Sequence, residues 1–139
     1  MANVTYAALQ VGDEIPAFQS EPISRHTLAL YCGASGDHNP IHVDVDFAKA
    51  AGYDDVFAHG MLSMAYMGRL LTNWVPHSAI RKLGVRFSAI THVHDVVTCT
   101  GKVIEKTQQD GENCVRLAVS ATTQDGAQTL KGEAVVALP

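Results

Sequence analysis

The second half of the chain alternates between apolar and polar residues with a period of two. Over residues 80–89, Leu83, Val85 and Phe87 share one face, and the intervening positions form the other. Because side chains of a β-strand point alternately to opposite sides, this period predicts a strand over residues 80–89. Three more strands are expected at 96–106, 114–123 and 129–138, and the turn sequences Gln109-Asp110-Gly111-Glu112 and Asp125-Gly126 between them predict an antiparallel meander.

The first half follows a helical pattern instead. Residues 60–74 are apolar around most of the helix circumference and include small residues that permit close approach, so they predict a buried helix that Pro76 ends. The other expected elements are a strand at 15–23, a helix at 25–32 with Ser24 as its N-cap, and a helix at 45–51 between the N-cap Asp44 and a left-handed Gly52.

One strand, then helices, then four strands is the element order of an α+β protein. A long antiparallel sheet has one face to cover, and the apolar helix at 60–74 is the segment suited to cover it. We therefore predict a single hotdog fold, in which an antiparallel β-sheet wraps around a central apolar helix.

Length, composition and charge indicate the number of domains and the kinds of partner to expect. The chain has 139 residues, of which 47% are hydrophobic and 17% charged, and this is typical of one globular domain spanning residues 1–139. A net charge of −4 does not favour a nucleic-acid or anionic-membrane partner. No leader sequence and no apolar segment of about 20 residues is visible, so we expect no membrane association.

The cysteines narrow the expected compartment. Cys32, Cys99 and Cys114 are odd in number and have no C-x-x-C spacing, which argues against a disulfide framework and against a zinc site. A reducing, cytoplasmic setting fits this usage best.

The candidate chemistry is concentrated in residues 34–61. Asp37 and His42 lie five residues apart, and Asn39-Pro40 between them prevents a continuous helix, so both belong to an irregular loop that can aim them at one point. A carboxylate and an imidazole that converge on one water form a general acid/base pair. Gly60, at the start of the apolar helix, leaves free backbone N–H groups that suit a developing oxyanion.

These residues carry a resemblance to a known family. The segment Ala34-Ser35-Gly36-Asp37-x-Asn39-Pro40-Ile41-His42-x-Asp44, followed by His59-Gly60-Met61, resembles the hydratase motif of the MaoC-like dehydratases, the (R)-specific enoyl-CoA hydratases. The resemblance covers the whole chain. It departs from the family at residues 90–95, where relatives commonly have a Pro-Val and a Gly-Asp turn, so the rim of the substrate tunnel is expected to differ.

The resemblance implies syn addition of water to a trans-2-enoyl thioester of CoA or acyl-carrier protein, and the reverse dehydration of a (3R)-hydroxyacyl thioester. It assigns Asp37 and His42 to the water and the N–H of Gly60 to the thioester oxygen. Asn39 is expected to shape the loop, and Ser63 to hold Asp37 or to line the pocket. Neither a cofactor nor a metal is implied, and His59 is left outside the predicted site.

Two other functions remain open. A hotdog acyl-CoA thioesterase typically places a lone carboxylate on the central helix, whereas residues 60–74 contain no Asp or Glu. Some hotdog subunits are non-catalytic partners in heterodimeric dehydratases, but this chain has the complete motif and is expected to be catalytic. A homodimer is the simpler expectation, with two sheets joined edge to edge.

Two further sets of residues are candidate ligand sites. His92 and His94 would share a strand face, but no carboxylate or cysteine completes a metal set at ligand spacing. The basic residues Arg69, Arg81, Lys82 and Arg86 are candidates for the phosphates of a carrier arm, although charges on strands are usually only solvated.

Overall fold

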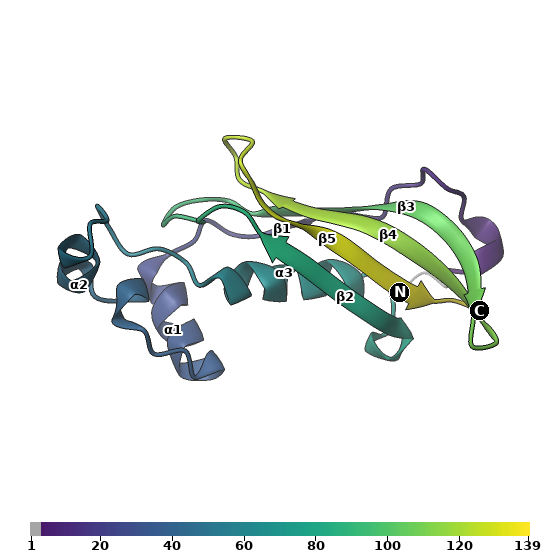
Figure 1. The fold of residues 1–139 in the computed structure, drawn as a ribbon, viewed down its shortest axis with the longest axis horizontal. Coiled ribbons are helices and arrows are strands. Elements are labelled where there is room, and N and C mark those ends of the chain that lie inside the picture. The colour runs from purple at the N-terminus through teal and green to yellow at the C-terminus, as the bar shows by residue number, and fades with distance from the viewer. Residues whose placement is uncertain (1–3) are drawn as a thin grey trace.

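A five-stranded antiparallel sheet curls around helix α3 in the computed structural model, which describes residues 4–139 (Figure 1). Its strand order is β1-β3-β4-β5-β2. The predicted α+β hotdog fold is therefore confirmed. The strands are β1 (Phe18–Gln19), β2 (Ile80–Phe87), β3 (Thr98–Gln109), β4 (Glu112–Thr122) and β5 (Gln128–Ala137).

The first strand differs most from its prediction. The strand expected at residues 15–23 is wrong, because regular pairing is limited to the two residues of β1, which lie opposite Cys99 and Thr98. Pro16 and Pro22 flank it, and a proline has no N–H to donate to a sheet. The bounds of the other four strands differ from the predicted ones by at most three residues.

The helices begin at the predicted caps. Ser24 Oγ accepts from the N–H of Thr27 at 3.0 Å, and Asp44 Oδ1 accepts from two N–H groups at the start of the second helix. The first helix continues to Ser35 and ends at Gly36, which has a φ of 75°. It is thus three residues longer than predicted. The helices are α1 (Arg25–Ser35), α2 (Val45–Ala50) and α3 (Gly60–Thr72), with short 3₁₀ turns at Tyr6–Ala8, Pro40–His42 and His77–Ala79.

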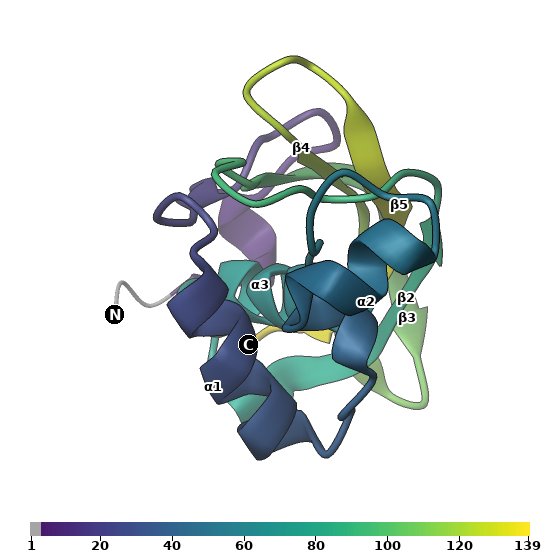
Figure 2. The ribbon, with the colours of Figure 1, turned by 90° about the vertical axis from the view of Figure 1, so that its left-hand side faces the viewer.

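Helix α3 fills the concave side of the sheet. Met67, Leu70 and Leu71 are fully buried against the sheet side chains. The predicted helix is largely buried, although Met61 and Ala65 are exposed on one flank. Helices α1 and α2 lie together at one end of the molecule (Figure 2). This end holds the loop between them and the N-terminus of α3.

All three cysteines are free and buried. Among residues 4–139, no helix has the length and apolar content needed to cross a membrane. The expectation of one domain over 1–139 includes residues 1–3, which lie outside the described part of the chain.

Candidate active site

The loop after α1 is held by its own side chains. Gly36 turns the chain in the left-handed conformation, and Ser35 Oγ accepts from the N–H of Asp37 at 3.1 Å. Asp37 Oδ1 accepts from the N–H of Asn39 at 3.3 Å, and Asn39 Oδ1 accepts in turn from the N–H of Ile41 at 3.1 Å. These turns are typical of Asp and Asn side chains. Asn39 therefore contributes to the shape of the loop.

The structure brings Asp37 and His42 together. His42 is buried, with 8% of its surface exposed, and its Nδ1–H donates to the carbonyl of Phe57 at 2.7 Å. This bond leaves Nε2 of the neutral ring unprotonated, with its lone pair 4.0 Å from Oδ2 of Asp37. The separation is too long for a direct hydrogen bond, but it fits a water that donates to both atoms at about 2.8 Å each.

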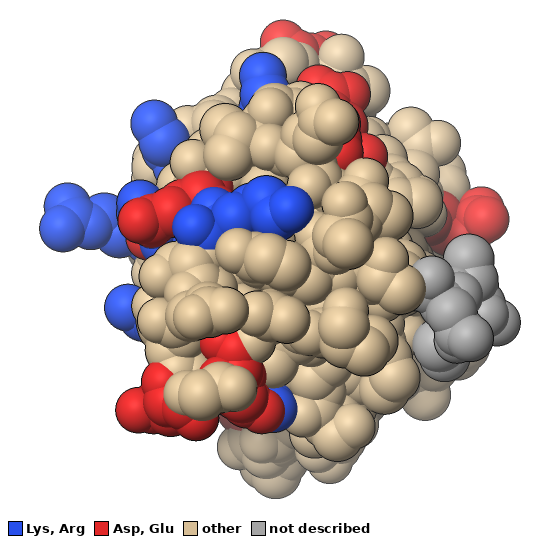
Figure 3. All heavy atoms as spheres, turned by 90° about the vertical axis from the view of Figure 1, so that its right-hand side faces the viewer, with Lys and Arg blue, Asp and Glu red and all other residues tan. Residues whose placement is uncertain are grey.

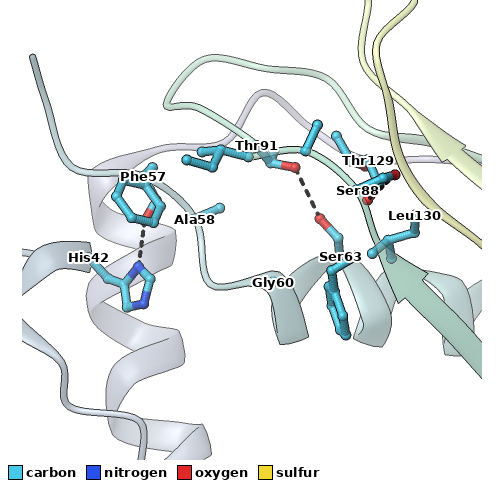
Figure 4. Close-up of a pocket in the computed structure, with 12 residues that line it drawn as sticks. His42, Phe57, Ala58, Gly60, Ser63, Ser88, Thr91, Thr129 and Leu130 are labelled. Atoms are coloured by element: carbon cyan, nitrogen blue, oxygen red, sulfur yellow. Dashed lines mark hydrogen bonds between the residues drawn. The ribbon is translucent and has the colours of Figure 1, made fainter. Parts of the chain in front are cut away.

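A cavity of about 420 Å³ opens beside His42, between the start of α3 and the end of β2 (Figure 4). Most of the lining groups are apolar or carry a hydroxyl. Asp37 is not among them, and its side chain remains 52% exposed. The lining residues are His42, Phe57, Ala58, Gly60, Ser63, Phe87, Ser88, Ala89, Ile90, Thr91, Thr129 and Leu130.

Gly60 lies at the helix end of this cavity. As the first residue of α3 it has an N–H that no carbonyl within the helix can accept, and it lies at the positive end of the helix dipole. The ring of Phe87 occupies the space beside it, because a Cβ on Gly60 would lie 2.9 Å from Phe87 Cδ1. The position therefore offers a backbone donor next to a close aromatic neighbour.

Ser63 lines the cavity one turn further along α3. Its Oγ lies 3.4 Å from Oγ1 of Thr91, and both residues are buried. Of the two expected roles, the structure places Ser63 in the lining and pairs it with Thr91, not with Asp37.

Sequence reasoning left out His59, which the structure places in contact with both predicted residues. Its ring stacks on that of His42 with centroids 3.8 Å apart, and its Nε2 lies 3.3 Å from the carbonyl oxygen of Asp37. Burial and then the charge of His42 lower the pKa of His59, against smaller raising effects of Asp37. Its position next to Gly60 at the helix entry was the available signal.

One cluster has the composition of a metal site but not its geometry. One ligand atom each from Asp37, His42 and His59 lie within 4.8 Å of one another. However, the two imidazole planes are inclined by only 25° and stacked, so their in-plane lone pairs do not converge on one point. We therefore assign no metal to these residues.

The other candidates from the sequence lie elsewhere. His94 sits in a turn with a φ of 74°, so the shared strand face predicted for His92 and His94 is wrong. Ile90 and Thr91, from the segment that departs from the family pattern, do line the cavity, as expected for its rim.

Two of the four basic residues are engaged in contacts within the chain. Arg81 donates to both carboxylate oxygens of Glu112, and Arg69 lies over the ring of Phe18. Figure 3 shows positive and negative side chains next to one another on the end of the molecule opposite to α1 and α2. Arg81 is thus held by an acidic partner and is a poor candidate for phosphate binding.

Comparisons with known proteins agree with this description. Residues 7–125 match the family model of the MaoC like domain. An (R)-specific enoyl-CoA hydratase of Aeromonas caviae is 31% identical over 134 residues, which are 95% of this chain and 97% of the relative. A mitochondrial 3-hydroxyacyl-[acyl-carrier-protein] dehydratase of Arabidopsis thaliana is 25% identical over 135 residues, or 94% of this chain and 78% of the relative.

The fold is shared with a solved structure over nearly the whole chain. The unliganded R-hydratase PhaJ1 of Pseudomonas aeruginosa superposes with a TM-score of 0.85 and 32% identity, covering 99% of this chain and 86% of the other. The curled sheet, its central helix and these relatives define a hydro-lyase with a hotdog fold. This chain belongs to the MaoC-like dehydratase family.

Proposed function

We propose that this protein adds water to trans-2-enoyl thioesters to give (3R)-hydroxyacyl thioesters, and catalyses the reverse dehydration. The observation that carries the proposal is the pair formed by Asp37 and the unprotonated Nε2 of His42, 4.0 Å apart beside a cavity. The substrate is a thioester of CoA or of acyl-carrier protein, and no cofactor takes part. The named activities of the relatives support this substrate class.

In this mechanism, Asp37 and His42 hold one water by accepting its two protons in hydrogen bonds. The water oxygen forms a bond to C3, and one member of the pair takes the proton that the oxygen loses. The electrons of the C2=C3 bond move toward C2 and the thioester oxygen, so an enolate develops. Return of a proton to C2 from the same side completes syn addition.

The N–H of Gly60 stabilises the enolate oxygen. It is a preorganised donor at a helix N-terminus, and one donor of this kind stabilises a transition state by roughly 3–4 kcal/mol in comparable oxyanion sites. In this mechanism the thioester lies between this donor and His42, and the fact that both residues line the cavity supports this placement (Figure 4). Asn39 has a supporting role in the loop, and Ser63 contacts the acyl side of the substrate.

We further propose that the protein acts as a homodimer. Strand β2 is one of the two edge strands of the sheet, and among the strands of residues 4–139 it pairs only with β5. Large apolar side chains lie exposed at or near this edge, including Phe87 at 54% and Met61 at 55%. A second copy that pairs with β2 would cover both. Light scattering after size exclusion should give twice the monomer mass, and a monomer that gains activity only with a second hotdog chain would favour a heterodimer instead.

The direct test is hydration of crotonyl-CoA and of longer enoyl-CoAs by the purified protein. We expect loss of the ultraviolet absorbance of the conjugated thioester and formation of the (3R) product, analysed by chiral chromatography. Release of free CoA thiol without a hydroxyacyl product would instead identify a thioesterase. A folded dimer that hydrates no acyl chain of any length would contradict the proposal.

Replacing Gly60 by alanine tests the oxyanion donor. The new Cβ would lie 2.9 Å from Phe87 Cδ1, so the half-exposed ring has to move and the substrate must bind next to a methyl group. We expect kcat for crotonyl-CoA to fall by about tenfold or more, because the donor and the thioester oxygen no longer align. Gly68→Ala is the matched control in the same helix, since no atom lies within 4 Å of its added Cβ. It should retain full activity.

A further inference from the structure

His59 is buried among side chains and backbone of α1 and the following loop, and these neighbours include both residues that hold the water in the proposed reaction. Only 1% of its surface is exposed. One face of its ring stacks on His42, with ring centroids 3.8 Å apart, and Tyr31 approaches edge-on at 4.8 Å. Its Nε2 is 3.3 Å from the carbonyl oxygen of Asp37 and 3.3 Å from Sγ of Cys32.

The surroundings of the two ring nitrogens determine the tautomer of His59. Nδ1 is buried and has no hydrogen-bond partner within residues 4–139. A proton on Nδ1 would therefore be an unsatisfied buried donor, and the bare Nε2 would then face the lone pairs of the Asp37 carbonyl. With the proton on Nε2, the ring instead donates to that carbonyl. The neutral Nε2–H tautomer is the one that the site accommodates.

Protonation of both nitrogens is opposed by the same surroundings. An imidazolium would again place an N–H on Nδ1 without an acceptor, and it would lie directly against the ring of His42. Burial of His59 and the charge of His42 lower its pKa in agreement with this reasoning. His42 therefore stacks on an uncharged ring.

We infer that His59 is a positioning residue: its Nε2–H fixes the backbone of Asp37, while its ring face fixes the plane of His42. The inference rests on the proposed hydration reaction for its kinetic consequence. One rigid side chain from the entry of α3 is thereby joined to both residues that hold the water. Because these residues are on the loop after α1, His59 also sets the position of the loop relative to Gly60.

An apolar core residue would not account for this arrangement. A phenylalanine of similar shape could fill the same space and stack on His42, without leaving an unpartnered nitrogen in the interior. Of the two ring nitrogens only Nε2 has hydrogen-bond partners among residues 4–139, namely the carbonyl oxygen of Asp37 and the weaker acceptor Sγ of Cys32. The two functions of the ring can therefore be separated by substitution.

The test compares His59→Phe with His59→Gln. Phenylalanine keeps a ring for His42 but loses the donor, whereas glutamine keeps an N–H donor near the position of Nε2 but loses the stacked ring. For His59→Phe, we expect kcat for crotonyl-CoA to fall by about 100-fold with KM changed less than about threefold, because the reacting groups are misplaced while the substrate cavity remains. His59→Gln should recover about tenfold of that loss. Cys32→Ala is the control, because it removes the other neighbour of Nε2 and should leave kcat unchanged.

Nitrogen NMR of the wild-type protein tests the same inference without any activity. We expect His59 to show a protonated Nε2 and a bare Nδ1 from about pH 5.5 to 8.5, across the range where an ordinary histidine titrates. A protonated Nδ1, or an imidazolium within this range, would overturn the inference even if the enzyme were active. So would full activity of a folded His59→Phe. An inactive wild type with the expected tautomer would refute the proposed reaction but leave the placement of Asp37 and His42 by His59 intact.

Discussion

Asp37→Asn is expected to lower kcat for enoyl-thioester hydration by at least about a hundredfold. Asparagine has nearly the same shape, and its side-chain oxygen can still accept from the N–H of Asn39 and hold the turn. The negative charge is lost, however, so the water loses the strong acceptor that faces Nε2 of His42 at 4.0 Å. Steady-state kinetics with crotonyl-CoA should therefore show a fall in kcat with little change in KM.

The thermal unfolding midpoint should stay close to that of the wild type, because the Asp37 side chain is half exposed. Asp46→Asn makes the same change of charge on the exposed surface of α2 and should leave kcat within about twofold of the wild type. Combining Asp37→Asn with His42→Ala should add little to the larger single effect, since both residues act on one water. Additive losses, or an Asp37→Asn enzyme with half its activity, would contradict the paired mechanism.

Gly132→Ala is expected to destabilise the fold by at least about 3 kcal/mol. A Cβ at this position would lie 1.9 Å from the carbonyl oxygen of Gly84 and 2.7 Å from Cα of Val85. Both are backbone atoms of β2, so no rotation of a side chain can relieve the overlap. Strand β2 would have to separate from β5, which would also displace Phe87 from the entrance of the cavity.

Urea unfolding followed by circular dichroism measures this effect. Gly84→Ala is the control on the neighbouring strand, because no atom lies within 4 Å of its added Cβ. We expect it to change the free energy of unfolding by less than about 1 kcal/mol. If Gly132→Ala unfolded at the same urea concentration as Gly84→Ala, the close approach of β2 and β5 would be wrong.

Local signals were sufficient to predict most of the fold. The period of two over residues 80–89 and the turn residues of the meander fix strands β2 to β5, because alternation and tight turns depend only on neighbours in sequence. Residues 15–23 contain two prolines, which cannot donate to a sheet, and the structure forms only a two-residue strand there. Which strands become edges cannot be predicted in this way, since β2 pairs with β5, about fifty residues further along the chain.

The candidate site likewise combines contacts that are local in sequence with contacts between distant segments. Asp37 and His42 belong to one short loop, so their spacing alone predicts that they meet. His59 contacts the backbone of Asp37, 22 residues earlier in sequence, through a carbonyl that carries no residue-specific signal. From the sequence alone, Arg81 of β2 is a candidate for phosphate binding. Its carboxylate partner, Glu112, lies at the start of β4, 31 residues later, and the sequence does not show that the two meet. Contacts between residues far apart in sequence form only in the folded chain, so the sequence pattern does not predict them.

The position of Asp37 outside the lining of the cavity has a consequence for the order in which reactants arrive. Its side chain is 52% exposed, whereas His42 lines the cavity that holds the acyl thioester in the proposed mechanism. In the proposed mechanism, water therefore reaches the reacting point from the side of the loop, and the thioester from the side of α3. In this mechanism the two reactants would use separate entrances, so a bound enoyl chain would not block its co-substrate, and the water eliminated in the reverse reaction could leave before the acyl product does.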